Sequence, residues 1–403
     1  KKSYGQAKLV KVLVPSPDRE KPPCPVYKQC GGCQLQHLSY PAQLANKRQT
    51  VVDALERIGH FHKVQVLDTL GALHPWHYRN KMQVPVAQSK NHQLRIGCFA
   101  AGTHQVIDVK DCLIQQETNN KIAQITREWM TQYHIAALEE DSRKGLVRHI
   151  MGRTGVKTGE VMAVLITNES VVPHLKELAQ LLRAQIPGFT TLVQNINTRH
   201  TNVIMGQKNK VIWGPGFIHD QLGKFTFAIS PHSFFQVNTE QAELLYETAL
   251  QYAALTGKEN VIDAYCGTGT ITLFLAQKAR RALGIEIVPA AIHDAHENAK
   301  HNHVTNTEFI CADAAKELPD LVRHGSRPDV VVLDPPRAGC EKRVLDAIAQ
   351  VRPKRVVYVS CNPASLARDA AILRDHGFVL RKVQPVDVFP HTCHVDSVAL
   401  FSR

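Results

Sequence analysis

Short apolar runs alternate with amphipathic segments from about residue 230 to the C-terminus. The apolar runs are rich in Val and Ile, and we expect them to form strands at 261–265, 283–287, 308–310, 330–334 and 356–360. Amphipathic segments typical of helices follow three of these runs, at 270–279, 289–301 and 364–375. Apolar strands that alternate with helices are typical of a parallel sheet covered on both faces. The pattern therefore predicts a Rossmann-like, doubly wound α/β domain over residues 230–403, with further strands at 378–389 and 395–402.

Residues 24–229 show a mixed pattern. Alternation of apolar and polar positions predicts strands at 81–86, 94–99, 104–109, 160–167 and 190–197. Helical spacing of apolar positions predicts helices at 40–58, 117–137 and 172–185. This combination favours a central α+β domain with an antiparallel sheet.

Residues 1–23 differ from both regions. Residues 1–14 read as one strand-like stretch, and four prolines between positions 15 and 23 end it. We therefore expect this stretch to be a separate N-terminal segment followed by a linker.

The chain is basic, with a formal net charge of +12 and a pI of about 9.2. Residues 1–63 contribute eleven Lys or Arg against four Asp or Glu. Such an excess of positive charge suits a polyanionic partner, of which nucleic acid is the commonest. No run of 18 apolar residues and no secretory signal is present, so we expect a cytoplasmic protein without a membrane span.

A glycine-containing loop follows the first strand of the C-terminal domain. Gly267 and Gly269 lie in this loop, where they let the backbone approach a ligand closely. Acidic residues end the next three strands, and they are Glu286, Asp313 and Asp334. Because ligands of open α/β sheets bind at the carboxyl ends of the strands, the pattern predicts a nucleoside cofactor there, with an acid on its ribose. A dinucleotide enzyme would show a third glycine, and Thr272 stands there instead. A Rossmann-type domain without a cofactor remains the plainer alternative.

Two further loops point into the same crevice. Asp334-Pro335-Pro336-Arg337 follows the fourth strand, and Ser360-Cys361-Asn362-Pro363 follows the fifth. Cys361 precedes a predicted helix, whose N-terminus stabilises a thiolate, although a Cys at a strand end is often a small core residue. Methyltransferases that act on amino groups place an aromatic residue after the prolines, where this chain has Arg337. The RNA methyltransferases that act on carbon 5 of cytosine place a Cys after the fourth-strand proline, and that Cys is also missing.

Cysteines cluster near the N-terminus. Cys24, Cys30 and Cys33 are close in sequence, and Cys112 follows much later. Four thiols can hold zinc or an iron–sulfur cluster. The spacing slightly favours zinc, whereas Gly31 and Gly32 offer N–H groups to cluster sulfurs and favour iron.

Together these motifs resemble the bacterial RNA uracil-5-methyltransferase family that acts on 23S rRNA. The resemblance covers essentially the whole chain. Its most specific segments are the Cys-x5-Cys-x2-Cys turn, 234–238, 263–270, 334–339, 360–363 and 390–392.

The resemblance implies a mechanism and its residues. Cys361 would be the nucleophile that adds to carbon 6 of uracil, and Asp396 the base, in a position where the family has Glu. S-adenosylmethionine would be held by Gln236, Tyr265, Glu286 and Asp334, with Asp313 near the adenine. A 4Fe–4S cluster would be held by Cys24, Cys30, Cys33 and Cys112.

The resemblance also bears on partners and on the N-terminus. It implies an RNA substrate, with 23S rRNA favoured, and we expect a monomer that binds no membrane. A tRNA substrate, or an RNA-binding chaperone with secondary methylation activity, is the alternative. Family members usually begin with an RNA-binding TRAM barrel, and residues 1–23 would be its remnant and linker, so we expect the chain to be truncated. The segment 74–82, with Trp76, Arg79 and Lys81, is the best candidate for contacting RNA.

Overall fold

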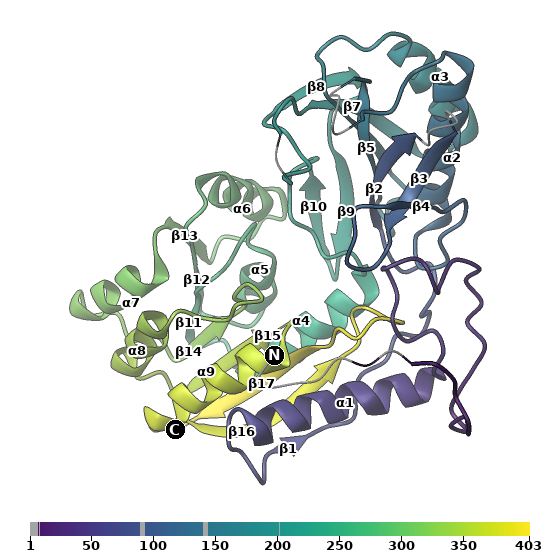
Figure 1. Ribbon diagram of the computed structural model, residues 1–403. Helices are drawn as coiled ribbons and strands as arrows, with labels where there is room; N and C mark the ends of the chain where they lie inside the picture. The colour runs from purple at the N-terminus through teal and green to yellow at the C-terminus, as the bar shows by residue number, and fades with distance from the viewer. Residues whose placement is uncertain (1–6, 8, 89–92, 140–143, 201) are drawn as a thin grey trace.

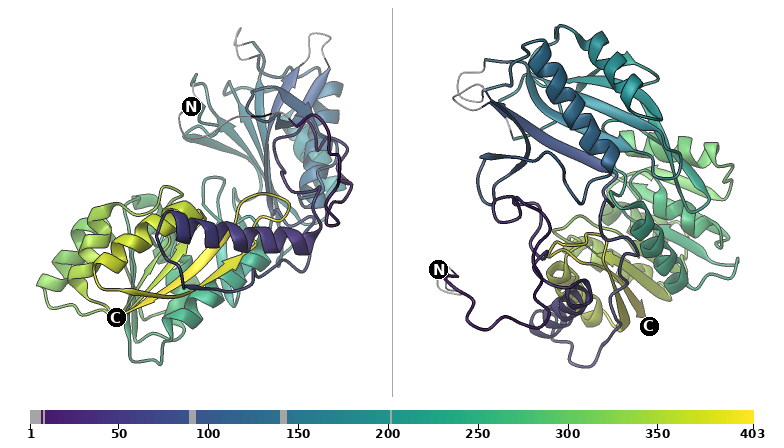
Figure 2. Two further views of the ribbon diagram at one scale, coloured as in Figure 1. Left: turned by 60° about the horizontal axis from the view of Figure 1, so that its bottom comes forward. Right: turned by 90° about the vertical axis from the view of Figure 1, so that its right-hand side faces the viewer.

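The chain folds around two separate sheets. The computed structural model describes residues 7, 9–88, 93–139, 144–200 and 202–403. A C-terminal sheet and a central sheet form two bodies that meet along one side (Figures 1 and 2).

The C-terminal sheet has eight strands in the order β1-β16-β17-β15-β14-β11-β12-β13. Its bounds are β1 Gln65–Val66, β11 Asn260–Asp263, β12 Arg281–Glu286, β13 Thr307–Cys311, β14 Val330–Leu333, β15 Arg355–Ser360, β16 Val379–Val386 and β17 Asp396–Ser402. Only β17 runs antiparallel to its neighbours among the described strands. The predicted doubly wound sheet is therefore confirmed.

Helices cover both faces of this sheet. Their bounds are α4 Thr239–Ala253, α5 Thr270–Ala276, α6 Pro289–His301, α7 Ala314–Arg323, α8 Lys342–Val351 and α9 Pro363–Asp375. Successive residues of one strand face opposite cores: Val330 and Val332 pack with α4, α5 and α6, whereas Val331 and Leu333 pack with α7, α8 and α9. Such burial on both faces explains why these strands read as continuous apolar runs.

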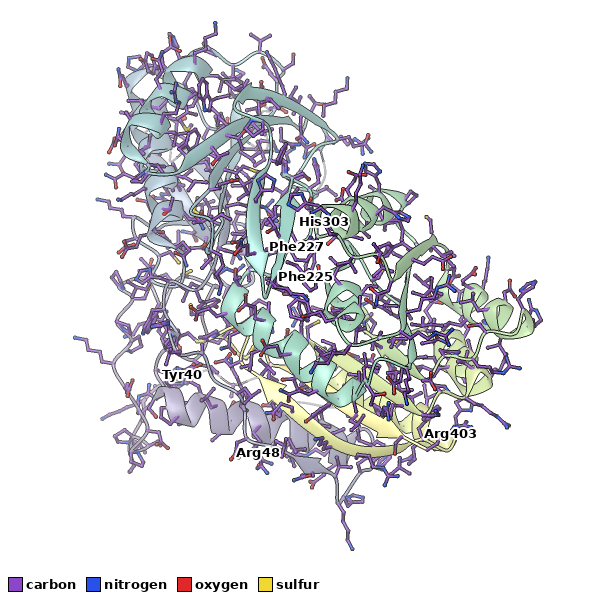
Figure 3. The ribbon with its side chains drawn as sticks, turned by 180° about the vertical axis from the view of Figure 1, so that it is seen from behind. Tyr40, Arg48, Phe225, Phe227, His303 and Arg403 are labelled. Atoms are coloured by element: carbon purple, nitrogen blue, oxygen red, sulfur yellow. The ribbon has the colours of Figure 1, made fainter. Side chains whose placement is uncertain are left out.

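Helix α1 (Tyr40–Arg57) also belongs to this body. Its Val51 and Leu55 are buried in the same core as Ala367 and Ala370 of α9. Arg48 of α1, labelled in Figure 3, donates to the carbonyl oxygen of Val66 at 3.1 Å, and β1 pairs in parallel with β16. The sequence-based division placed α1 and β1 in the central domain, whereas the structure packs them against the C-terminal sheet.

The central sheet has seven strands in the order β4-β3-β2-β5-β6-β7-β8. The bounds are β2 Lys81–Gln88, β3 Leu94–Phe99, β4 Val106–Asp108, β5 Val147–Thr154, β6 Val161–Thr167, β7 Phe189–Ile196 and β8 Lys208–Trp213. Helices α2 (Glu117–Gln132) and α3 (Leu175–Gln185) share its core. The pairs are antiparallel except β6 with β7, so the predicted α+β region is confirmed. Strand β5 escaped prediction because it is buried almost throughout and therefore does not alternate.

A hairpin of β9 (Ile218–Leu222) and β10 (Phe225–Ile229) links the two bodies. Phe225 and Phe227 of this hairpin, labelled in Figure 3, are buried in the core that contains α4 and α5.

The N-terminal segment differs from expectation. Residues 9–14 form no strand with any described part of the chain, and their apolar side chains are exposed. Residues 1–6 and 8, the rest of the expected strand, lie outside the described residues. Within the described part of the chain, no helix has the length and apolar character needed to cross a membrane.

Candidate active site

The glycine loop and its acidic partner come together at the carboxyl ends of β11 and β12. The N–H of Gly267 donates to Glu286 Oε2 at 3.2 Å, and the N–H of Val288 donates to Glu286 Oε1 at 2.9 Å. Gly269 has a φ of +82°, and a Cβ there would lie 3.1 Å from the ring of Phe309. A side chain at Gly269 would be strained by both effects, whereas a Cβ at Gly267 would meet open space. The loop thus leaves room beside a fixed carboxylate.

The other residues expected to bind the cofactor differ in their surroundings. Tyr265 is half-buried beside Cys340, and Gln236 is half-buried next to Tyr246. Asp313 instead caps α7, because its Oδ1 accepts from the N–H of Ala315 at 3.0 Å, and it pairs with Arg343 at 3.1 Å. Its side chain is thus already engaged in holding a helix.

Three carboxyl groups crowd the centre of the crevice. Burial, together with the charges of Asp263 and Asp396, raises the pKa of Asp334 to about 8. Burial raises the pKa of Asp396 to about 7 and that of Asp263 to about 6. Asp263 Oδ1 and Asp396 Oδ1 are buried without a hydrogen-bond partner. Buried polar atoms are normally paired, so these two unpaired oxygens are candidates for contact with a ligand or substrate.

Cys361 follows β15 directly and lies beside the carboxyl groups of Asp396 and Asp334. Burial first, then the charges of Asp396 and Asp334, raise the pKa of the Cys361 thiol. The sequence-based expectation was the opposite, because the N-terminus of α9 favours a thiolate. Burial and the nearby carboxylates outweigh that helix, so the Cys361 thiol is harder to ionise than a free thiol.

Asp396 begins β17 and follows a loop that is held from several sides. In this loop His391 has a φ of +65° and its ring stacks on Trp76 at a centroid distance of 3.6 Å. Tyr78 donates to the carbonyl oxygen of Pro390 at 3.1 Å. The segment 74–82, expected to contact RNA, therefore supports the loop that carries Asp396.

Two neighbouring aromatic residues separate into different roles. Phe235 is buried in the core, whereas Phe234 is 72% exposed. Of this pair, only Phe234 is free to stack on a base.

The clustered cysteines line one cavity between the N-terminal turn and the central sheet. The cavity has a volume of about 460 Å³, and the thiols of Cys24, Cys30, Cys33, Cys98 and Cys112 line it. The N–H of Gly32 donates to the Cys30 sulfur at 3.3 Å, a contact that would also stabilise a thiolate ligand. Within the described residues, no three such side chains are close enough together to form a ready metal site. The donor set fits a sulfur-ligated group, which would draw the thiols together.

Cys98 was missed by sequence reasoning. It lies within β3, far from the other cysteines in sequence. The bridge between Cys30 and Ala100, together with the hydrogen bond from the Gly31 N–H to the carbonyl oxygen of Phe99, brings it to the cavity. The raised pKa of the Cys98 thiol reflects the neighbouring Cys30 thiol first and burial second.

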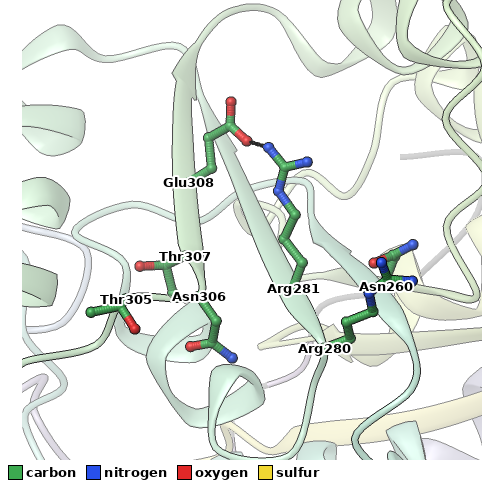
Figure 4. A pocket seen from close by; sticks show the side chains of 7 residues that line it. All are labelled: Asn260, Arg280, Arg281, Thr305, Asn306, Thr307 and Glu308. Atoms are coloured by element: carbon green, nitrogen blue, oxygen red, sulfur yellow. Dashed lines mark ion pairs between the residues drawn. The ribbon is translucent and has the colours of Figure 1, made fainter.

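A second hollow lies at the opposite end of the C-terminal sheet. It has a volume of about 570 Å³ and is lined by residues at the amino ends of β11, β12 and β13, including Asn260, Arg281 and Glu308 (Figure 4). Arg281 and Glu308 form an ion pair across it. This hollow is at the amino ends of the strands and is therefore separate from the crevice described above. Ligands of such sheets bind at the carboxyl ends.

The fold and the crevice define the class of S-adenosylmethionine-dependent methyltransferases. The model of the tRNA (uracil-5-)-methyltransferase family matches residues 39–403, and the chain belongs to this family of RNA 5-methyluridine methyltransferases. It is an RNA methyltransferase enzyme.

Relatives and a solved structure agree with this assignment. The chain is 49% identical over 400 residues to an uncharacterized RNA methyltransferase of Halalkalibacterium halodurans, covering 99% of this chain and 87% of that protein. It is 48% identical over 404 residues to one of Clostridium acetobutylicum, covering 100% and 88%. The crystal structure of the Pyrococcus abyssi tRNA (uracil-54, C5)-methyltransferase in complex with S-adenosyl-L-homocysteine is similar with a TM-score of 0.77 and 27% identity, covering 97% of this chain and 88% of that one.

Proposed function

We propose that this protein methylates carbon 5 of uridine in 23S rRNA, with Cys361 as the nucleophile and Asp396 as the base. The observation that carries the proposal is the juxtaposition of a half-buried thiol with a buried, unpaired carboxyl group at the carboxyl end of the sheet. Carbon 5 of uracil is a poor nucleophile, and a thiol beside a carboxyl group can overcome this.

The chain's residues account for each bond change. The Cys361 thiolate adds to carbon 6, and carbon 5 becomes an enolate carbon that can attack a methyl group. When bound, S-adenosylmethionine supplies this methyl group. Asp396 then takes the proton from carbon 5, the bond between sulfur and carbon 6 breaks, and Cys361 is released as a thiolate.

S-adenosylmethionine would be held by the crevice residues Gly267, Gly269, Glu286, Tyr265, Gln236 and Asp334. The Glu286 carboxylate is fixed by two backbone N–H groups and suits the ribose hydroxyls. Asp313 would contribute less, because its oxygens are engaged with α7 and Arg343.

Trapping of RNA tests the nucleophile. RNA containing 5-fluorouridine carries fluorine in place of the proton, so elimination fails and the protein stays attached. The wild-type protein should appear as a covalent adduct on a denaturing gel, and Cys361→Ala should not. An adduct formed by Cys361→Ala would assign the nucleophile to another residue, with the exposed Cys393 the next candidate.

A 4Fe–4S cluster on Cys24, Cys30, Cys33 and Cys112 is part of the proposal. The shared cavity and the Gly32 hydrogen bond to the Cys30 sulfur support it. No step of the proposed reaction requires the cluster. Its role would be structural, because it would hold the N-terminal turn against the central sheet. Residues 1–23 would be the TRAM remnant and linker, residues 24–229 the RNA-binding region, and the protein a cytoplasmic monomer.

A tRNA substrate is the second candidate. The similarity to the Pyrococcus abyssi enzyme, which is named for uracil-54 of tRNA, favours it. Mapping 5-methyluridine in both RNAs from a deletion strain distinguishes the two: loss from 23S rRNA alone supports the first proposal, and loss from tRNA alone supports the second.

A further inference from the structure

Helix α1 carries a lysine whose side chain is almost completely buried. Lys47 is 1% exposed, and its Nζ lies 2.5 Å from Oδ1 of Asp387, whose side chain is 0% exposed. The same ammonium group donates to the carbonyl oxygen of Phe389 at 3.0 Å. The second carboxylate oxygen of Asp387 accepts from the Tyr40 hydroxyl at 3.0 Å. A buried ion pair of this kind is costly to break, because the remaining charge loses its partner.

These contacts hold the start of the loop between β16 and β17. Further along the loop, the N–H of His391 donates to Oε1 of Gln43 at 3.0 Å. Gln43 lies one helical turn before Lys47, so both side chains project from the same face of α1. Tyr40, the first residue of α1 and labelled in Figure 3, lies two turns before Lys47 and contacts the same Asp387. The loop ends at Asp396, so α1 sets the path of the segment that delivers this residue.

We infer that Lys47 is a positioning residue for proton removal from carbon 5: its buried ammonium group anchors the loop that carries Asp396 and supplies the positive charge that this carboxylate faces. This inference rests on the proposed function, because it requires Asp396 to act as the base. Helix α1 would thus take part in the reaction although it precedes the Rossmann-like domain, residues 230–403, in the sequence.

The charges around Asp396 come from several elements. Lys47 of α1 and Arg337 after β14 favour the charged form, whereas Asp387 after β16 disfavours it. Asp334 after β14, Cys361 after β15 and Tyr246 of α4 also face it. Burial is the main cause of their raised pKa values, and the charge of Asp396 adds to it.

Lys47 is the stronger of the two cations. Arg337 is exposed and lies 2.8 Å from His394 Nδ1, so solvent screens its charge. Lys47 is buried and therefore little screened. Burial raises the pKa of Asp396 to about 7, and the Lys47 charge is the largest influence that opposes this rise.

The two charges of the ion pair have opposite effects on the pKa of Asp396. Removal of the Lys47 charge should raise the pKa of Asp396, so the base is lost at a higher pH. Removal of the Asp387 charge should lower that pKa at every pH where Lys47 stays protonated, so the base survives to a lower pH. If Lys47 only stabilised the fold, removal of either charge would change the pH profile in the same direction, because both substitutions break the same ion pair.

The experiment compares Lys47→Met, Asp387→Asn and the double variant with the wild-type protein between about pH 5.5 and 9. Two quantities are measured with RNA containing ordinary uridine: tritium release from carbon 5, and the amount of methylated covalent adduct. The adduct separates the two titrations, because a protonated base lets it accumulate whereas a protonated Cys361 prevents it. Lys342→Met is the matched control, since it removes the cation of an exposed Lys–Asp pair on α8.

At pH 6, Lys47→Met should release tritium on the order of tenfold more slowly than wild type and accumulate adduct, and it should recover at pH 9, as a change of one pKa unit would produce. The acid limb of Asp387→Asn should move to lower pH, and Lys342→Met should match wild type. Acid limbs that coincide in all variants, or single variants that shift in the same direction, would overturn the inference.

Two further comparisons guard against ambiguity. If Lys47→Met does not fold, the double variant should still have its acid limb at higher pH than Asp387→Asn, and an identical position would count against Lys47. If wild-type protein forms no adduct with 5-fluorouridine RNA, the proposed function fails and the inference fails with it. Adduct formation with unshifted profiles would overturn the inference alone.

Discussion

Ser360 pairs with Ser397 at the end of the antiparallel ladder between β15 and β17. Cys361 directly follows Ser360, and Asp396 directly precedes Ser397. The ladder therefore brings the proposed nucleophile and the proposed base to the same end of the sheet, where the charge of Asp396 contributes to the raised pKa of the Cys361 thiol after burial.

Replacement of the base should stop the reaction at its last stage. Asp396→Asn keeps the shape but cannot accept the proton, so addition and methyl transfer proceed and elimination does not. We expect a stable protein–RNA adduct that carries a methyl group, with tritium release from carbon 5 lowered about 10²–10⁴-fold. Normal turnover by Asp396→Asn would remove this residue from the mechanism. Asp396→Glu, which restores the family side chain, should keep or increase the activity.

The same carboxyl group should reduce stability at alkaline pH. Its pKa in the folded protein is raised to about 7 from an ordinary value of 3.8, so the folded state resists its ionisation. The cost is absent below about pH 4, grows as the pH rises, and is complete above about pH 7. Asp396→Asn should therefore raise the free energy of unfolding by roughly 1–3 kcal/mol at pH 8 and change it little at pH 4. Urea titrations at both pH values measure this difference, and an equal effect at both would contradict the raised pKa.

The cysteine cavity should hold iron in anaerobically purified protein. Cys112→Ser should lose the iron and the broad visible absorbance, because it removes one of four proposed ligands. Cys98→Ser is the matched control, since Cys98 lines the same cavity but is not a proposed ligand. Metal analysis that finds zinc and no iron in the wild-type protein would rule out the cluster, and loss of iron from Cys98→Ser would make Cys98 a ligand.

Phe234 should contribute to RNA binding. Its ring is exposed at the start of the segment that contains Gln236, and stacking of a base on an aromatic ring is worth about 1–3 kcal/mol. We expect Phe234→Ala to weaken RNA binding by about 5–150-fold without a change in melting temperature. Val171→Ala, which alters an equally exposed apolar side chain on the central region, should leave both unchanged. Equal RNA affinities of Phe234→Ala and wild type would exclude a stacking role.

The sequence by itself determined the local elements of this protein. Helix α6 begins and ends where its amphipathic pattern predicts, at residues 289 and 301, and β3 spans the predicted 94–99. The glycine loop and the acidic residues after the strands could also be recognised from the sequence, because each motif consists of residues that are close together in the chain. The periodicity of a helix or strand is a property of neighbouring residues, so it can be recognised without knowledge of the fold.

Only the tertiary structure decided which distant residues meet. Lys47 and Asp387 are separated by 340 positions, and nothing in the pattern around either residue indicates the other. Cys98 joins the cysteine cavity because the N-terminal turn bridges to Ala100 after β3, and helix α1 joins the C-terminal sheet through a two-residue strand that carries no periodic signal. The direction of the Cys361 pKa shift likewise required the positions of Asp334 and Asp396. Charge interactions and burial depend on distances in three dimensions, which a local pattern does not contain.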